Sequence, residues 1–73
     1  MFVVSYFLRQ SDLQGVDTIG LYKTLRALGY RVLIGNQLMK VEALVKKFES
    51  KEHIYKEMII DIESLLKRFK IKK

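Results

Sequence analysis

The chain contains no cysteine, although it is only 73 residues long. A domain of this size buries only about 60% of its unfolded-chain surface, so natural domains of this length often add disulfides, a metal or a partner subunit. Without cysteine, disulfides and thiolate zinc sites are excluded, and the single histidine, His53, cannot form a histidine cage within one chain. We therefore expect one domain over residues 1–73 that is stabilised by association with a second copy.

Neither a membrane span nor a secretory signal is expected. The apolar residues 1–8 lack the basic segment of a signal peptide and are followed by Arg9. No run approaches the roughly 18 apolar residues of a transmembrane helix. We expect a cytoplasmic protein with no membrane insertion, a compartment that the lack of cysteine also fits.

No complete set of catalytic residues can be read from the sequence. His53 lies in a polar stretch without a matching serine elbow, and we interpret it as a solvated helical residue. Asp12 and Asp17 flank the loop after the first predicted strand. For these residues, helix capping is a simpler interpretation than metal binding. Gly15 and Gly20 lack the spacing of a phosphate-binding loop. We expect no enzyme activity, no cofactor and no metal.

The first part of the chain has the pattern of a β-α-β unit. Residues 2–8 are rich in strand-forming Val, Phe and Tyr, and residues 30–34 form a second predicted strand. Between them, a helix is predicted to begin near Asp17 or Thr18 and to end before Gly29, a residue suited to a left-handed backbone. A crossover of this length predicts that the two strands are parallel.

Residues 36–73 contain neither glycine nor proline, and their apolar residues follow a heptad. With Leu38 at position a, Glu52 is the one polar residue among the a and d positions through Phe69. This spacing predicts a helical segment that associates with a second copy. The predicted dimer interface consists of Leu38, Val41, Val45, Phe48, Tyr55, Ile59, Ile62, Leu66 and Phe69.

Two architectures fit this pattern. In the first, residues 37–70 form a continuous helix of about 51 Å, which exceeds a compact monomer and requires a dimer to cover it. In the second, the chain breaks near Ser50, which caps a third helix that folds back as a hairpin. The unbroken heptad favours the first, whereas the wide apolar arc completed by Ile54, Met58 and Leu65 favours the second.

The net charge of +6 is concentrated at the C-terminal end. Five of the 14 Lys and Arg residues lie in the last seven positions, and without them nine basic residues remain against eight acidic ones. Cations near the end of a helix are favoured by its dipole, which is the simpler interpretation. The functional alternative is a phosphate-binding surface. The candidate nucleic-acid-binding residues are Lys67, Arg68, Lys70, Lys72 and Lys73.

Residues 30–66 also resemble ribbon-helix-helix DNA-binding proteins in their order of strand, helix and helix. Residues 30–34 would be the ribbon, and Ser50 with the apolar residues after it would match the capped second helix. The family's glycine before this cap is absent, and the residues before the ribbon have no counterpart. The resemblance implies a ribbon that pairs with its own copy in the major groove, with Arg31 and Leu33 facing outward.

Together these features predict an α+β protein with the order β-α-β-α-α. A β-α-β unit over residues 1–35 is followed by one long helix or two consecutive helices over residues 36–73, which hold the dimer interface and the basic end. The predicted function is a non-catalytic, homodimeric protein-interaction module, such as a regulator, adaptor or inhibitor that binds another protein. The alternative is a nucleic-acid-binding transcriptional regulator that uses the basic end on a dimeric scaffold.

Overall fold

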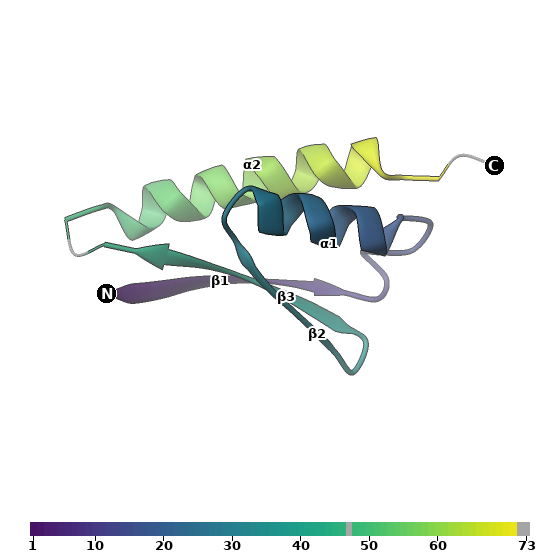
Figure 1. Cartoon of the computed structure of the whole chain (residues 1–73), viewed down its shortest axis with the longest axis horizontal. Helices are drawn as coiled ribbons and strands as arrows, with labels where there is room; N and C mark the ends of the chain where they lie inside the picture. The colour runs from purple at the N-terminus through teal and green to yellow at the C-terminus, as the bar shows by residue number, and fades with distance from the viewer. Residues whose placement is uncertain (47, 72–73) are drawn as a thin grey trace.

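The computed structural model describes residues 1–46 and 48–71 and has an α+β fold of three strands and two helices (Figure 1). The elements in chain order are β1 (Phe2–Arg9), α1 (Thr18–Ala27), β2 (Arg31–Gly35), β3 (Leu38–Val45) and α2 (Lys51–Arg68). The first three elements lie where the sequence predicts them. The fourth is a strand and not the predicted helix, so the order is β-α-β-β-α.

The sheet has the strand order β1-β3-β2, and β3 is antiparallel to both of its neighbours. The predicted parallel direction of β1 and β2 is confirmed, but the two strands are not neighbours in the sheet, because β3 lies between them. The two outer strands still run in the same direction, which makes the first part of the chain a β-α-β unit split by a third strand. β3 can take the central place because a tight hairpin turn brings it directly alongside β2.

The β2–β3 hairpin turns at Asn36 and Gln37, whose φ angles are 42° and 64°. Two consecutive residues with positive φ form the type I′ turn, whose twist matches that of the strands it connects. Asn adopts this conformation more readily than most residues, whereas Gln does not share that preference. Asn36-Gln37 thus differs from the Asn-Gly pair by which such hairpins are usually recognised in a sequence.

Residues 38–45 form a strand, so the predicted continuous helix over residues 37–70 is wrong. Alternate side chains of β3 are buried under the helices, as the period of two along a strand requires. Val41 and Val45 fit both this alternation and the heptad, which explains the error. The strand, helix and helix order of the ribbon-helix-helix resemblance is wrong for the same reason. The buried residues of β3 are Met39, Val41, Ala43 and Val45.

Both helices begin at residues that cap their first turn. Asp17 Oδ1 accepts a hydrogen bond of 3.1 Å from the N–H of Gly20, and Ser50 Oγ accepts one of 3.3 Å from the N–H of His53. Each bond satisfies an N–H group that has no partner within the helix. The predicted caps at Asp17 and Ser50 are confirmed. Gly29, which follows α1, has a φ of 100°, also as predicted.

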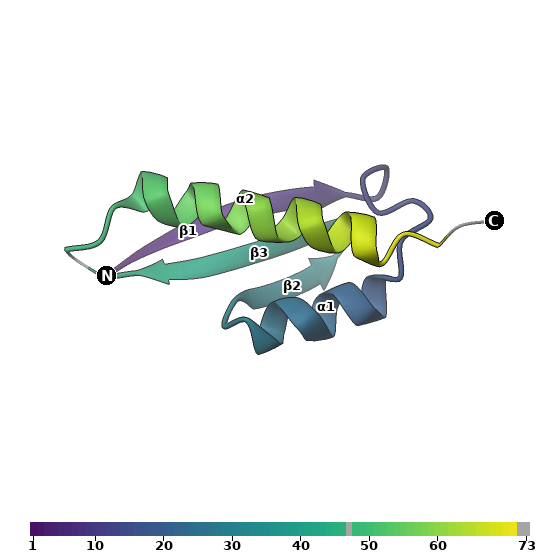
Figure 2. The same ribbon diagram turned by 90° about the horizontal axis from the view of Figure 1, so that it is seen from above.

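Both helices pack on the same side of the sheet, α2 over β1 and β3 and α1 along β2 (Figures 1 and 2). One apolar core fills the space between the two layers. The phenol of Tyr30 adds a polar link, because its hydroxyl donates a hydrogen bond of 2.6 Å to Asp61 Oδ2 on α2. The buried core residues are Leu8, Leu21, Leu25, Val32, Met39, Val41, Ala43, Met58, Ile62 and Leu65.

The segment after α2 lies against the loop before α1. The N–H of Asp17 donates to the carbonyl oxygen of Phe69 over 2.9 Å, and the N–H of Ile71 donates to that of Gly15 over 2.7 Å. The ring of Phe69 also approaches Gly20, where an added Cβ would lie only 2.9 Å from Cε1 of the ring. The start of α1 and the end of α2 therefore hold each other in place.

Candidate functional site

The side of the sheet opposite the helices is not covered by any segment within residues 1–46 and 48–71 (Figure 1). We call this side the open face. Because side chains alternate along a strand, it carries the residues that lie between those of the core. The strand register arranges them in cross-strand rows, namely Val3–Leu44, Ser5–Glu42–Arg31, Phe7–Lys40–Leu33 and Arg9–Leu38–Gly35.

Large apolar side chains of the open face are strongly exposed. Val3 and Leu44 in one row are 53% and 67% exposed, and Phe7 and Leu33 in another are 52% and 43% exposed. The first of these rows has no member on β2, because β2 begins opposite Glu42, and a hollow of about 110 Å³ lies beside it. Apolar residues gathered on one surface are typical of interaction sites, whereas single exposed ones are normal.

Charged side chains lie between the apolar groups. Arg31 Nε is 3.9 Å from Glu42 Oε1, and Lys40 Nζ is 3.5 Å from Glu42 Oε2. Lys40 Nζ also lies 5.7 Å from the centroid of the Phe7 ring. The Glu42 side chain is only 15% exposed, whereas that of Arg31 is 75% exposed. With Arg9 at the end of β1, the open face has more positive than negative charge.

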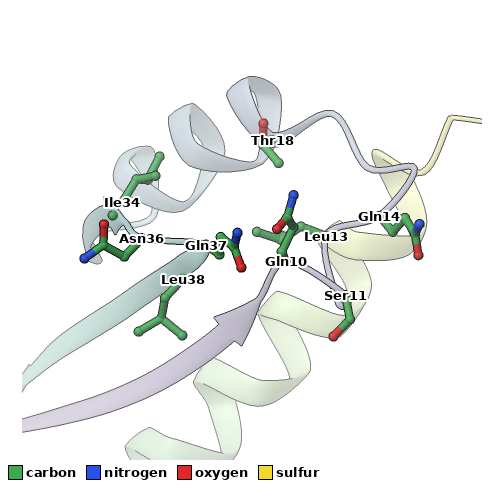
Figure 3. A pocket seen from close by; sticks show the side chains of 10 residues that line it. Gln10, Ser11, Leu13, Gln14, Thr18, Ile34, Asn36, Gln37 and Leu38 are labelled. Carbon is green, nitrogen blue, oxygen red and sulfur yellow. The ribbon is translucent and has the colours of Figure 1, made fainter.

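A larger hollow of about 880 Å³ lies between the β2–β3 turn and the loop after β1 (Figure 3). In the close-up, Gln10 and Gln37 lie near its centre, and the N–H of Gln10 donates to the carbonyl oxygen of Gln37 over 2.9 Å. None of the ten described residues that line it is charged. Amides and hydroxyls can hold a polar group by hydrogen bonds, but they do not supply an acid–base pair. The polar lining consists of Gln10, Ser11, Gln14, Thr18, Asn36 and Gln37.

The carboxylates and the histidine singled out in the sequence satisfy local partners. Asp12 Oδ2 accepts a hydrogen bond of 2.9 Å from the N–H of Arg9, and Asp17 caps α1. His53 Nε2 lies 3.1 Å from Glu57 Oε1 on the exposed side of α2. Across residues 1–46 and 48–71, no group of three or more His, Asp or Glu side chains could hold a metal ion. Asp12 and Asp17 therefore accept local backbone hydrogen bonds, and His53 contacts Glu57 on its own helix.

Tyr30 has the one strongly perturbed ionisation among the described groups. Burial raises the pKa of its phenol above the ordinary value, and the hydrogen bond to Asp61 and the charges of Asp61 and Glu57 raise it further. The phenol is therefore protonated at neutral pH and can donate a hydrogen bond. Tyr30 is therefore a structural hydrogen-bond donor.

The predicted dimer-interface residues do not form one surface. Three are fully buried in the chain's own core, namely Val41, Val45 and Ile62. Three are half buried, namely Ile59, Leu66 and Phe69. Leu38 lies on the open face, and Phe48 is 86% exposed in the turn before α2. Tyr55 is 38% exposed and packs on Tyr6, with ring centroids 6.1 Å apart. Of the predicted interface residues, Leu38, Phe48 and Tyr55 therefore have surface that a second copy could reach, and they lie on β3, in the turn before α2 and on α2.

The described candidates for nucleic-acid binding gather at the C-terminal end of α2. Three of the candidate nucleic-acid-binding residues are exposed at the end of α2, namely Lys67, Arg68 and Lys70. Lys72 and Lys73 lie outside the described residues. Lys51 is at the other end of α2, about 24 Å away at the helical rise per residue. Lys51 therefore lies outside the basic cluster at the end of α2.

Sequence reasoning missed the open face. One indication was present, because Lys40 and Glu42 alternate with Met39, Val41 and Ala43, as expected for a strand with one buried side. The open face also requires that both helices cover the same side of the sheet. This depends on the strand order, which no local sequence pattern indicates.

Neither helix, over the described part of the chain, has the length and apolar character to cross a lipid bilayer. Comparison with known proteins gave no match among family models, curated proteins or solved structures.

Proposed function

We propose that this chain is a cytoplasmic, non-catalytic, homodimeric protein-interaction module that binds another protein as a regulator, adaptor or inhibitor. The observation that carries the proposal is the open face, on which Val3, Phe7, Leu33 and Leu44 are each between 43% and 67% exposed. Removal of apolar surface from water contributes about 25 cal/mol per Å² and dominates most protein association. The sheet thus has one side that stabilises the monomer and one side suited to a partner.

The charges of the open face indicate the chemistry of that partner. Arg9, Arg31 and Lys40 outnumber Glu42, which already lies within 4 Å of two of these cations. A partner with acidic side chains around an apolar centre would complement this pattern. The hollow of about 110 Å³ beside Leu44 has room for one apolar side chain. A second copy of the open face would bring cations against cations and is the poorer occupant.

The second copy is better placed at the edge of the sheet. β1 is an outer strand, and an uncovered strand edge has unpaired N–H and C=O groups that can pair with another chain. Pairing there leaves the β2 and β3 part of the open face, with Leu33 and Leu44, free for the other protein. The second copy therefore binds along the edge of β1, and the other protein binds on the open face.

The test compares two variants that each introduce two acidic residues at exposed apolar positions. Leu33→Asp/Leu44→Asp changes open-face positions on β2 and β3, away from the outer edge of β1, and Ile19→Asp/Ile60→Asp changes helix positions that are 67% and 65% exposed. A partner would be identified by cross-linking to the wild-type protein, purified, and titrated by calorimetry. The open-face variant should lose at least about tenfold in affinity, the effect expected when contacts at the centre of an interface are lost.

The control variant should bind within about threefold of wild type, a change below 1 kcal/mol. Circular dichroism establishes that both variants are folded. If the open-face variant binds as tightly as wild type, the open face is not the binding surface.

Nucleic-acid binding is the alternative, and the exposed cations at the end of α2 favour it. Removal of the chain after Leu66 would also remove the packing of Phe69, so charge substitutions make the cleaner test. One triple variant replaces Lys67, Arg68 and Lys70 with Ser. The matched control replaces Lys23, Lys51 and Lys56 with Ser. Fluorescence anisotropy with duplex DNA and single-stranded RNA at physiological salt should show no binding that depends on the first set. Binding lost in that variant and kept in the control would favour a nucleic-acid function instead.

A further inference from the structure

The backbone of β1 alternates between groups that pair with β3 and groups that point away from the sheet. The N–H of Gln10 donates to the carbonyl oxygen of Gln37 over 2.9 Å and continues the β1–β3 register. In an antiparallel pair, hydrogen-bonded positions alternate with positions whose N–H and C=O point outward. The even-numbered positions of β1 therefore pair with β3, and Val3, Ser5 and Phe7 present their backbone groups at the outer edge.

Arg9 shows the same alternation and closes one end of the edge. Its N–H donates to Asp12 Oδ2 over 2.9 Å, and its carbonyl oxygen accepts from the N–H groups of Asp12 and Leu13 over 2.9 and 3.3 Å. From Phe2 to Leu8 there is neither a charged residue nor a proline. Natural edge strands are usually protected by such residues against pairing with another chain. The edge before Arg9 is therefore suited to a partner strand.

We infer that β1 pairs antiparallel with β1 of a second copy about a two-fold axis at Ser5. This inference deepens the proposed homodimer and rests on it. In this register Val3 lies opposite the partner's Phe7, and Ser5 lies opposite the partner's Ser5. Among two-fold registers, the one centred on Ser5 lets all three outward residues form hydrogen-bonded pairs, which gives about six N–H···O bonds.

The side chains of β1 suit this register. On the open face, Val3 of each copy lies beside Phe7 of the other, so the two-fold axis creates two such pairs. A β-branched residue beside an aromatic one stabilises neighbouring strands. The small Ser5 separates these two pairs, and β1 places no like charges across the axis between Phe2 and Leu8. Both members of the pair are about half exposed in the monomer, at 53% and 52%.

The helix-covered side of the sheet also contributes to this interface. Tyr6 lies next to Ser5, and its ring packs on Tyr55 of α2 with 6.1 Å between centroids. Tyr55 is 38% exposed, and Ile59 lies one turn further along the same side of α2. Pairing through β1 brings these residues of the two copies toward each other. Two residues of the interface predicted from the sequence thus belong to it.

The pairing joins two three-stranded sheets into one continuous sheet of six strands. Both open faces then lie on the same side and form one extended surface. A dimer of this kind presents two copies of the apolar and cationic site to the other protein. Simultaneous binding of two sites on that protein would raise the overall affinity.

Single cysteines introduced into this cysteine-free chain test the axis directly. In Ser5→Cys, the two thiols would lie opposite each other in a hydrogen-bonded pair, where the Cα atoms are about 5.5 Å apart and a disulfide can form. Ser64→Cys is the control, because Ser64 is exposed on α2, away from this edge. Under mild oxidation at micromolar concentration, Ser5→Cys should form disulfide-linked dimer at least about tenfold faster than the control.

Proline at the axis supplies the second measurement. Ser5→Pro removes an outward N–H that the β1–β3 ladder does not use, and proline is tolerated at such edge positions. The matched control is Ser5→Thr, which keeps the N–H. Light scattering after gel filtration should show a dimer for the wild type and Ser5→Thr and a monomer for Ser5→Pro. Circular dichroism shows whether Ser5→Pro is folded, and if it is not, the cysteine comparison decides the result.

The outcomes separate the inference from the proposal on which it rests. A wild-type dimer, with Ser5→Cys linking no faster than Ser64→Cys, would leave the homodimer standing and overturn the β1 pairing. A wild-type monomer at concentrations of tens of micromolar would overturn the homodimer and the β1 pairing together. Binding of another protein by the open face is measured independently of both.

Discussion

The hydroxyl of Tyr30 and the carboxylate of Asp61 are 2.6 Å apart in a hydrogen bond that joins the start of β2 to the middle of α2. Hydrogen bonds to a charged acceptor contribute about 1.5–3 kcal/mol to stability. This bond fixes α2 over the sheet at a point where the helix could otherwise slide on apolar side chains. The same part-buried bond contributes to the raised pKa of the Tyr30 phenol.

Removal of this hydroxyl should lower the stability of the protein. Tyr30→Phe is expected to reduce the free energy of unfolding by about 1.5–3 kcal/mol, because Asp61 loses its donor in a part-buried site. The control is Tyr22→Phe, whose hydroxyl accepts a bond of 3.2 Å from Arg26 on the exposed side of α1. Urea denaturation should show a loss of at most about 0.5 kcal/mol for the control. Equal losses in the two variants would contradict a special role for the Tyr30–Asp61 bond.

The same bond predicts a dependence on alkaline pH. The pKa of Tyr30 in the folded protein lies above its unfolded value of about 10, so the folded state holds the proton more tightly. The stabilisation is therefore complete below about pH 10 and is lost as the pH rises above it. The difference in unfolding free energy between wild type and Tyr30→Phe should stay constant up to about pH 9.5 and shrink as the pH rises from about 10 to about 11. A difference that stays constant over this range would show that the phenol does not titrate with folding.

Replacement of Gly20 by alanine should destabilise the protein, although Gly20 lies within a helix. Alanine favours an exposed helix by about 1 kcal/mol over glycine. Here its Cβ would lie 2.6 Å from Asp17 Oδ2 and 2.9 Å from Phe69 Cε1. We expect Gly20→Ala to lower the free energy of unfolding by about 1–2 kcal/mol, because overpacking outweighs propensity.

The contact with the ring can be separated by a double-mutant cycle. In the background of Phe69→Leu, the change Gly20→Ala should be less destabilising by at least about 0.5 kcal/mol. Thermal or urea unfolding of the four proteins measures this coupling. A Gly20→Ala protein more stable than wild type would show that the Phe69 ring moves aside at no cost.

The β2–β3 turn should become more stable with glycine at its second position. Gln37 has a φ of 64°, which glycine adopts without steric cost, and Asn-Gly is the preferred pair of a type I′ turn. Gln37→Gly is expected to raise the free energy of unfolding by about 0.5–1 kcal/mol. Gln14→Gly, at a loop position without positive φ, should instead leave stability unchanged or lower it. Lower stability for Gln37→Gly would contradict the turn geometry.

Local patterns predicted β1, α1 and β2 to within two residues at each end. Their ends depend on nearby residues, such as Asp17, whose side chain caps α1, and Gly29, which adopts a positive φ. The start of α2 was predicted in the same way, from the cap at Ser50. β3 was missed because its sequence fits a strand and a helix equally well at Val41 and Val45.

The open face could not be predicted from local patterns, because it depends on which strands become neighbours. Arg31 of β2 lies near Glu42 of β3 only because the two strands are neighbours in the sheet. In the predicted arrangement, with residues 38–45 in a helix, Arg31 and Glu42 would not have been cross-strand neighbours. The choice between these arrangements depends on contacts between residues far apart in the sequence. The spacing of apolar residues along the chain does not predict such contacts.

The central position of β3 has a consequence for the order in which the chain folds. While the ribosome has released only the residues up to Gly35, both finished strands lack the neighbour that they share in the native sheet. Once β3 emerges, its hairpin with β2 can close within microseconds, whereas β1 must close a loop that spans α1 and β2. The folding nucleus should therefore contain the hairpin, and β1 should be the last strand to join it.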